Sequence, residues 1–505
     1  MHRLVRGSLL LLAAMVVVAT GASGARKVAT VKAAAGPLET AVGFSDDYYA
    51  ADEYSTQFER IRAAGSKYVV IRAYWDRIAP AGSTQPAGFQ ASDPADTNYN
   101  WTTTDTLIKE AAAAGLKPML FITSAPTWAE GSGSGSAESG SYKPSPTALA
   151  QFMTAAATRY GGRFNDLPRV QYWAVWNEPN LNRFLSPQVV NKKAFAPTWY
   201  RSMLNAAADA IHGVNSSNVV IAGETAPFGT ASASRSQTMP ITFMENVLCV
   251  REKKVVNKKT KAVTYSYKSA CKNKVKFDVW AHHPYTQGGP TTKAKAHGNA
   301  SLGDMGDMRN VLNAAIKANH IVTNGKPRLW VTEFSWDSKP PDPKAVPIAL
   351  ETRWVSQMLY EMRNSGVSLV TWFILRDEPT ATSYFQSGLY SYGSDISNDK
   401  AKPLLRAFRF PFVALPNTTS GKTLLWGRTP KSKSGKVFIE RKSGRKWVKL
   451  KTLSANGSGI FKASIAKPAH TTLLRARLSN GSDQSAEFSL TAPKKSWTGC
   501  VWGTC

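Results

Sequence analysis

Eight short apolar stretches recur along the chain, and this repetition limits the possible folds more than any other feature. Each stretch is rich in β-branched and aromatic residues, which is typical of a strand buried in a sheet. The predicted strands cover residues 41–44, 68–75, 118–122, 170–176, 219–223, 277–283, 328–333 and 368–374. Helical patterns occupy most of the intervals, at residues 54–64, 104–114, 145–160, 198–212, 304–318 and 348–364, and a last helix follows at 403–408.

Eight alternations of strand and helix predict an α/β fold of the (β/α)8 TIM-barrel type. A doubly wound open sheet is the alternative that the same alternation allows. Eight near-equal units favour the closed barrel, and no glycine-rich dinucleotide motif follows the first strand. The predicted barrel domain covers residues 26–414.

The composition changes after Pro416, where short strand-like segments separated by turn residues replace the alternation. This pattern predicts a small all-β domain, an antiparallel β-sandwich of the immunoglobulin or fibronectin type, at residues 415–492. A tail at 493–505 contains Cys500 and Cys505. The 505 residues are too many for one ordinary domain, so a barrel and a smaller module account for the length.

The first 25 residues have the pattern of a secretory signal peptide. Arg3 and Arg6 precede an apolar run at 9–18, and small residues follow at 21–25. The alternative is a membrane anchor, but the run is too short to cross ~30 Å of hydrocarbon comfortably. We therefore predict a secreted, extracellular protein without a transmembrane span. Association with the cell wall is a further option that the same pattern allows.

Four cysteines fit an exported protein, in which cysteines are expected to pair. Proximity in the sequence favours Cys249–Cys271 and Cys500–Cys505, although three connectivities are possible. The segment 249–271 alternates in polarity around Tyr265, which predicts a disulfide-closed hairpin inserted in the barrel. No histidine lies at ligand spacing beside the cysteines, so we predict no metal site.

The net charge of +29 is concentrated in two regions. Residues 251–276 carry ten Lys or Arg and one acid, and the chain from residue 416 onward carries seventeen and three. Such density is compatible with nucleic acid, with an anionic cell-envelope polymer or with a solvated surface. Export and the lack of a recognition helix argue against nucleic acid, so the predicted partner of the basic C-terminal domain is an anionic envelope polymer.

Two carboxylic acids stand at the ends of predicted strands. Asn177 and Glu178 follow the fourth strand, and Glu333 ends the seventh. The C-terminal ends of barrel strands carry the chemistry, and strands four and seven face each other across the barrel. Two carboxyls ~5 to 5.5 Å apart suit a double displacement at a sugar carbon, which requires neither a metal nor an organic cofactor.

With these motifs the sequence resembles the retaining glycoside hydrolases of clan A, most closely families 39 and 5. The resemblance covers residues 40–412 and is carried by Asn177-Glu178-Pro179 and by Glu333. It implies that Glu178 is the acid/base and Glu333 the nucleophile. It also implies that Asn177 binds the sugar 2-hydroxyl, a contact that strengthens in the transition state.

Further residues match positions of the clan pattern and are therefore predicted to line the substrate site. Arg72 would keep the nucleophile ionised. The resemblance implies that His283 contacts the sugar and that Tyr285 can donate to the nucleophile. Trp372 would form the floor of the first sugar subsite. Trp128 and Trp336 are weaker candidates for stacking on sugars.

Several of these residues have ordinary structural alternatives. Arg72 could be a partner in a structural ion pair, and His282 fits a packing or backbone-bonding role better than that of a ligand. The tryptophans that precede strand ends are expected to pack in the core; they are Trp173, Trp280 and Trp330. Glu224, at the end of the fifth strand, and Asp46 and Asp47, after the first, are further acidic candidates.

Taken together, these features predict a secreted retaining β-glycosidase that hydrolyses O-glycosidic bonds of a poly- or oligosaccharide. Two alternatives use the same barrel. One is a non-catalytic protein that binds cell-wall or other polysaccharides, and the other is a transglycosylase that uses the same carboxylates. The presence of both carboxylates argues against the non-catalytic alternative.

Overall fold

The computed structural model describes residues 37–44, 49–230, 237–261, 263–379, 385–417, 419–468 and 473–491. The predicted signal peptide, Asp46, Asp47 and the Cys500–Cys505 pair lie outside the described residues.

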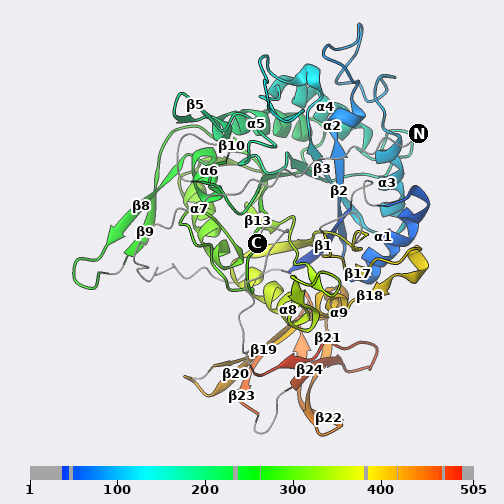
Figure 1. Ribbon diagram of the computed structural model, residues 1–505, viewed down its shortest axis with the longest axis vertical. Helices are drawn as coiled ribbons and strands as arrows, with labels where there is room; N and C mark the ends of the chain where they lie inside the picture. The colour runs from blue at the N-terminus through cyan, green and yellow to red at the C-terminus, as the bar shows by residue number, and fades with distance from the viewer. Residues whose placement is uncertain are drawn as a thin grey trace.

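The predicted TIM barrel is confirmed: eight parallel strands form one closed barrel (Figure 1). In barrel order they are β1 (Glu39–Phe44), β2 (Tyr68–Tyr74), β3 (Lys117–Thr123), β4 (Tyr172–Val175), β7 (Val219–Thr225), β11 (Val279–His282), β13 (Arg328–Val331) and β16 (Val367–Trp372). Side chains of alternate residues fill the interior, among them Val70, Phe121, Ile221 and Trp330. All eight strands overlap the ranges predicted from the sequence.

Helices surround the barrel and supply the outer layer of the core. They are α1 (Tyr54–Ala63), α2 (Trp75–Ile78), α3 (Thr102–Ala113), α4 (Pro146–Arg159), α5 (Ala196–Val214), α6 (Pro240–Val247), α7 (Met305–Lys317), α8 (Ile348–Asn364) and α9 (Pro403–Arg409). Helix α4 begins as its residue types require, because the Ser145 side chain accepts a hydrogen bond from the amide of Ala148 and Pro146 occupies the first turn. Helix α6 was not predicted. Among the described residues, no helix combines the length and apolarity that crossing a membrane requires.

Several short strand pairs belong to the loops and lie outside the barrel. They are β5 (Val189–Val190) with β6 (Lys193–Ala194), β10 (Val275–Lys276) with β12 (Ile321–Val322), β14 (Ser338–Lys339) with β15 (Val346–Pro347), and β17 (Tyr390–Ser391) with β18 (Lys400–Ala401).

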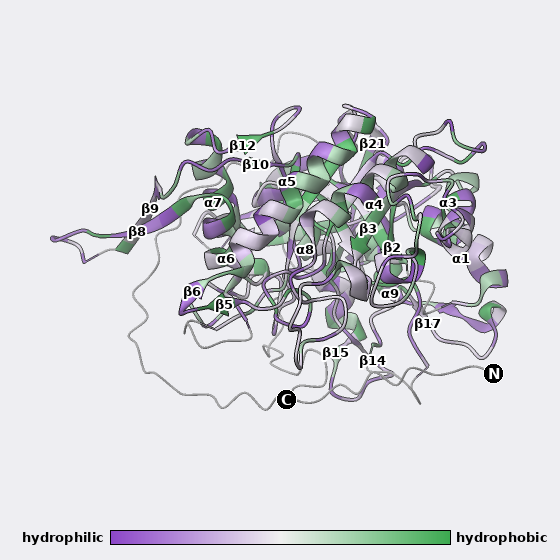
Figure 2. Cartoon of the chain, turned by 90° about the horizontal axis from the view of Figure 1, so that it is seen from above, coloured by the Kyte–Doolittle hydropathy of each residue, from purple (hydrophilic) through white to green (hydrophobic). Residues whose placement is uncertain are grey.

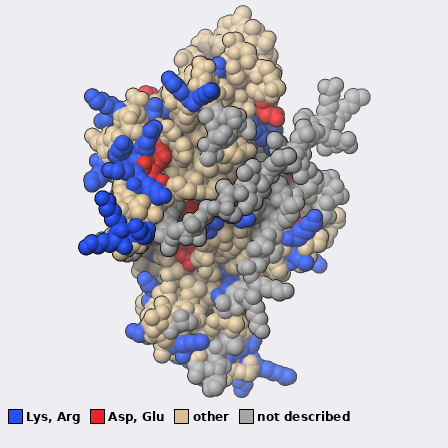
Figure 3. Space-filling model, turned by 60° about the vertical axis from the view of Figure 1, so that its left-hand side comes forward, with Lys and Arg blue, Asp and Glu red and all other residues tan. Residues whose placement is uncertain are grey.

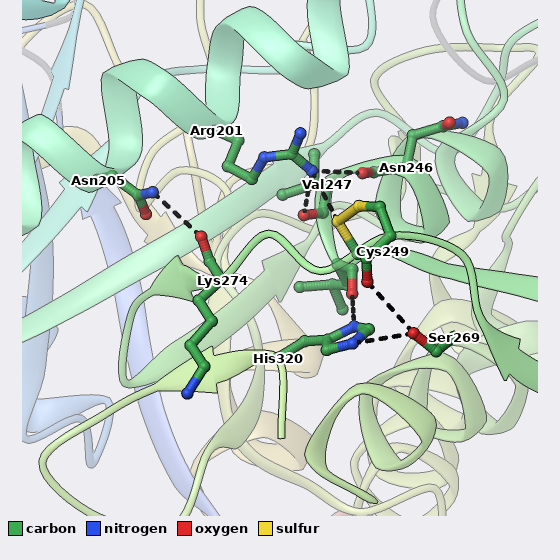
Figure 4. The surroundings of a disulfide bond; sticks show 10 residues. Arg201, Asn205, Asn246, Val247, Cys249, Ser269, Lys274 and His320 are labelled. Atoms are coloured by element: carbon green, nitrogen blue, oxygen red, sulfur yellow. Dashed lines mark hydrogen bonds between the residues drawn. A yellow bond between two sulfur atoms is a disulfide. The ribbon is translucent and has the colours of Figure 1, made fainter. Parts of the chain in front are cut away.

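The basic insert is the predicted hairpin, formed by β8 (Val250–Val256) and β9 (Val263–Ser269) and closed by the Cys249–Cys271 disulfide. It projects from the side of the barrel, and much of it is hydrophilic (Figures 1 and 2). Its base is held firmly (Figure 4): Arg201 donates to the carbonyls of Asn246 and Val247, and His320 bonds the Leu248 carbonyl and the Ser269 hydroxyl.

The C-terminal region consists of two antiparallel sheets. One contains β19 (Phe412–Asn417), β20 (Lys422–Arg428) and β23 (Ile460–Ala466); the other contains β21 (Gly435–Ser443), β22 (Lys446–Ala455), β24 (Leu473–Leu478) and β25 (Phe488–Ser489). Strand β19 spans the boundary that the sequence placed between residues 414 and 415.

This β-module shares its core with the barrel. The Trp426 ring of β20 lies 5.5 Å from the Tyr360 ring of α8. Trp426 belongs to the apolar cluster that continues into the barrel's outer layer, and Tyr360 packs against that cluster. Buried Arg428 donates to the carbonyl of Leu38 at the start of β1 over 2.6 Å. The module is therefore built onto the barrel below α8 and α9 (Figure 1).

Candidate active site

The polar residues predicted from strand ends gather at the C-terminal face of the barrel. Asn177 and Glu178 follow β4, Glu224 is the penultimate residue of β7, His283 follows β11 and Glu333 follows β13. Glu178 and Glu224 have positive φ angles of 38° and 47°. Left-handed backbone in non-glycine residues is strained and clusters at functional sites. The bends thus turn the side chains toward the barrel mouth at some energetic cost.

Glu333 is held by two donors. The Arg72 guanidinium donates to Oε2 at 2.5 Å, and the Tyr285 hydroxyl donates to Oε1 at 2.8 Å. The side chain of Glu333 is 10% exposed, so the guanidinium charge acts with little solvent screening. The structure therefore brings together the three residues that the sequence predicted to meet, while their catalytic roles stay predictions.

His283 connects the carboxylates of the site. Its Nδ1 lies 3.1 Å from Glu178 Oε1 and 3.9 Å from Glu333 Oε2, and its Nε2 lies 3.0 Å from Glu224 Oε2. Burial alone would lower the pKa of His283, but the charge of Glu333 and the bonds to Glu178 and Glu224 raise it to about 10. At neutral pH the ring is an imidazolium that donates from both nitrogens.

Glu224 is more central than the sequence indicated. It is completely buried, and its Oε2 accepts from His283 and from the Thr332 hydroxyl of the neighbouring strand end. Burial raises the pKa of Glu224, while those two bonds act in the opposite direction. Its position at the end of the fifth strand was the one available signal, because Glu178, His283 and Glu333 also stand at or just after strand ends.

Asn177 and His282 differ in whether their side-chain polar atoms are already hydrogen-bonded. Asn177 is 4% exposed and its Oδ1 has no hydrogen-bond partner among the described residues, so a sugar hydroxyl could satisfy it. His282 bonds the Thr225 hydroxyl and the Ala300 carbonyl, and burial lowers its pKa to about 3. It is a neutral packing residue, as expected from the sequence.

The prediction that Trp372 forms the floor of a sugar subsite is wrong. Trp372 is fully buried, its Nε1 donates to the Ser387 carbonyl, and its ring packs near Phe334 and against Phe408 of α9. Successive strand residues face opposite sides, so the residue that reaches the barrel mouth after β16 is Phe373. The two-residue period, counted from inward-facing Leu369, is the signal that would have identified it.

The other predicted tryptophans differ in how far they are exposed. Trp336 is 1% exposed, donates to the Gly288 carbonyl and packs against Trp354, so it too is unavailable to a sugar in this structure. Trp128 is half-buried on a loop and packs edge-on against Trp75. It stays a candidate for sugar stacking. The core positions predicted for Trp173, Trp280 and Trp330 are confirmed.

A small cavity of about 20 Å³ lies over Glu333. Arg72, Phe121, Thr332 and Phe373 line it, together with Gly43. A Cβ at Gly43 would come within 2.2 Å of the Phe373 carbonyl oxygen, so only glycine allows β1 and the end of β16 to approach this closely. The cavity combines a carboxylate, a guanidinium and aromatic surface, which are groups that can bind polar and apolar parts of a ligand.

Comparison with known proteins identifies the family of the chain. Over residues 31–376 the chain matches the family Cellulase (glycosyl hydrolase family 5). No curated protein matches by sequence.

Among solved structures, the chain is similar to a family 39 glycoside hydrolase from the gut symbiont Bacteroides cellulosilyticus WH2, with 14% identity, a TM-score of 0.49, and coverage of 85% of this chain and 79% of that one. It is also similar to a GH39 β-xylosidase from Caulobacter crescentus, with 17% identity, a TM-score of 0.46, and coverage of 82% and 85%. The family match spans more than half of the chain, and the chain therefore belongs to glycosyl hydrolase family 5, within clan A.

Proposed function

We propose that this chain is a secreted retaining β-glycosidase that hydrolyses O-glycosidic bonds of a poly- or oligosaccharide by double displacement. The observation that carries the proposal is the joint contact of Glu178 and Glu333 with one nitrogen of His283. The two contact distances limit the separation of the carboxylate oxygens to about 7 Å at most. Retaining enzymes need ~5 to 5.5 Å between their carboxyls, whereas inverting enzymes need ~6.5 to 9.5 Å. The upper limit is therefore compatible with the retaining range and leaves only the lower end of the inverting range.

In the first step, the Glu333 carboxylate attacks the anomeric carbon and forms a glycosyl ester. The bond to the leaving oxygen breaks, and the Glu178 carboxyl donates its proton to that oxygen, so the leaving group departs as an alcohol. Arg72 and Tyr285 each hold one oxygen of Glu333, which orients the carboxylate before the attack.

In the second step, the Glu178 carboxylate takes a proton from water, and the water oxygen attacks the same carbon. Glu333 departs as a carboxylate, to which Arg72 and Tyr285 can donate again. Two inversions leave the anomeric configuration retained. His283 lies 3.1 Å from Glu178 Oε1 and so helps to orient the carboxyl group that takes the proton.

The test is the product anomer formed from an aryl β-glycoside, followed by NMR in the first minutes. We expect a product in the β configuration. With a 2-deoxy-2-fluoroglycoside as the probe, we also expect a stable glycosyl ester on Glu333, located by mass spectrometry. An α product would refute the double displacement. If wild type and Glu333→Ala are equally inert on a broad glycoside panel while both bind polysaccharide, the chain is a binding protein. Preferential transfer to added acceptor sugars would identify a transglycosylase.

The proposed export is supported by the N-terminal residue pattern and by the Cys249–Cys271 disulfide, because disulfides persist in oxidising compartments. The expected mature N-terminus lies near residue 25. N-terminal sequencing of protein from the culture medium would test this, and an intact leader on protein found only inside cells would contradict it.

An anionic envelope polymer is the proposed partner of the C-terminal module. On the four-stranded sheet, the Trp447 ring lies under Arg475 at 4.3 Å and Lys442 at 5.2 Å, and the Phe438 ring lies near Arg477 and Lys449. Arg475 and Arg477 are bonded to Glu440, so Lys442 and Lys449 are the cations on this face that suit a linear polyanion.

Truncation would not test this idea, since the module shares its core with the barrel. The double substitution Lys442→Gln/Lys449→Gln should instead weaken salt-sensitive sedimentation with cell walls. The same change at Lys422 and Lys462, exposed residues of the other sheet, is the matched control. Equal sedimentation of the two variants would contradict the assignment of this face.

A further inference from the structure

A second cavity, of about 450 Å³, adjoins the catalytic site. It lies between the loop after β7 and the loop after β11. Tyr285 forms one wall, and the hydroxyl of the same residue donates to Glu333, so the cavity begins beside the nucleophile. We call it the lysine groove; its lining includes Phe228, Tyr285, Gln287, Lys293, Lys295 and Asn299.

The chemical character of the lysine groove is cationic and partly aromatic. Its lining contains Lys293 and Lys295 and no Asp or Glu among the described residues. Within that part of the chain, Lys295 has no carboxylate within 4.0 Å. Lys293 lies 3.9 Å from Asp304 and 3.8 Å from Asp307, both longer than a hydrogen bond, and its side chain is 44% exposed. Both lysines are exposed and able to bind an anion.

Phe228 gives the groove an apolar surface. Its side chain is 46% exposed, which is unusual for a ring of this size in the described residues. An exposed aromatic ring in a polar cleft can pack against the C–H face of a sugar. The groove therefore offers a sugar ring both an apolar face and a nearby positive charge.

The basic hairpin supports the loop that carries the lysines. His297 of this loop stacks on Tyr265 of β9 at 4.8 Å, and its Nε2 lies 2.5 Å from Glu252 Oε2 of β8. The hairpin base is in turn fixed by its disulfide and by Arg201 and His320 (Figure 4). The insert thus holds the wall of the groove in place.

The hairpin also extends the positive field. Lys and Arg are numerous on the side of the molecule that carries β8 and β9 (Figure 3). In the hairpin strands these cations are Arg251, Lys253, Lys254 and Lys268. A surface of one sign attracts ligands of the opposite charge and concentrates them near the cleft.

We propose that the lysine groove binds an anionic sugar unit of the substrate beside the glycosidic bond that is cleaved. The unit stacks on Phe228 and places its carboxylate or ester anion between Lys293 and Lys295. This proposal rests on the proposed glycosidase function and adds the substrate class: a polysaccharide that carries uronic acid or sulfated sugars.

The test measures binding separately from catalysis, in the inactive variant Glu333→Gln. The probes are glucuronoxylan, polygalacturonate and alginate, each with its carboxyl-reduced form, and dextran sulfate as the ester anion. We expect at least one anionic polymer to bind more tightly than its neutral counterpart, with the difference largely lost in 500 mM NaCl because exposed charges are then screened. Binding of dextran sulfate alone would assign the anion to a sulfated sugar.

Two variants locate the binding in the groove. In the Glu333→Gln background, Lys293→Gln/Lys295→Gln should weaken anionic binding by about 2- to 30-fold, as expected for two exposed ion pairs. The control, Lys109→Gln/Lys326→Gln, removes two lysines from α3 and from the opposite end of the barrel and should change nothing. Phe228→Ala should weaken the charged and the neutral forms alike, because stacking does not depend on the anion.

The inference is overturned if neutral and anionic polymers bind equally, or if the groove variant and its control lose affinity equally. Failure of the glycosidase proposal gives a different result. In that case wild type hydrolyses no glycoside, while the binding pattern of the inactive variants still reports on the groove.

Discussion

The link between Glu224 and His283 makes the strongest quantitative prediction. The substitution Glu224→Gln keeps the shape of the side chain and removes its negative charge. The bond to His283 Nε2, now 3.0 Å long and made to a carboxyl oxygen, would then join the imidazole ring to a neutral amide. His283 is fully buried, so water cannot replace the lost charge.

The magnitude follows from the kind of bond that is lost. A hydrogen bond between charged groups contributes about 1.5 to 3 kcal/mol and a neutral one about 1, so the difference of about 0.5 to 2 kcal/mol corresponds to about 0.4 to 1.5 pKa units. The pKa of His283, about 10 in the wild type, should therefore fall to about 8.5 to 9.6. Glu178 and Glu333 remain and keep it above the ordinary histidine value.

The raised pKa of His283 also determines how the stability of the fold depends on pH. The pKa of His283 is raised by folding, so its contribution is complete below pH 6.5 and is lost as the pH rises toward 10. In Glu224→Gln the loss should end about 0.4 to 1.5 pH units earlier, which corresponds to about 0.5 to 2 kcal/mol less stabilisation from this group. Comparing the two proteins at each pH removes the other titrations.

The assay is an NMR titration of ¹³C-labelled histidine between pH 5 and 11, with the His283 signal assigned by its disappearance in His283→Asn. Thermal unfolding over the same range provides the stability profile. His282 serves as an internal control, because its pKa of about 3 keeps it neutral throughout. An unchanged or raised His283 pKa in Glu224→Gln would refute the proposed network.

Three other substitutions test separate parts of the structure. Tyr285→Phe removes one 2.8 Å donor from Glu333, and kcat/KM should fall by about 10- to 150-fold with Tm nearly unchanged; an unaltered kcat/KM would exclude this contact from catalysis. The double change Cys249→Ser/Cys271→Ser removes the disulfide between two residues 22 positions apart and should lower the free energy of unfolding by about 3 kcal/mol. Early proteolysis of the hairpin is the local readout, and a hairpin that stays intact under protease would contradict this prediction. Trp426→Ala should cost about 3 to 5 kcal/mol and lower one common unfolding transition; two transitions, of which only one shifts, would show that barrel and module unfold independently.

Much of the fold could be read from local patterns. A buried parallel strand needs a short run of apolar, often β-branched residues, and this signal is strong enough to locate all eight barrel strands. Strand order then placed Glu178 and Glu333 at the same end of the barrel. The Cys249–Cys271 hairpin followed from local spacing and alternation in the same way.

The sequence pattern did not decide which residues line the site. Trp372 was chosen for its residue type and position, yet the register of β16 turns it toward α9 and presents Phe373 instead. The register depends on pairing with β1 and β13, which are distant in the sequence. A shift of one residue reverses the faces, so a side chain's direction needs the assembled barrel.

The sequence by itself determined the barrel, the order of its strands and the two carboxylates, because apolar periodicity and strand ends are local properties. Only the tertiary structure decided that Glu224 and His283 form one buried network with them. The same is true of Phe228 and Lys295, which come together in one groove, and of the β-module, which completes the barrel's core. These features depend on contacts between segments far apart in the chain, where distance, burial and the loss of solvent screening decide the chemistry.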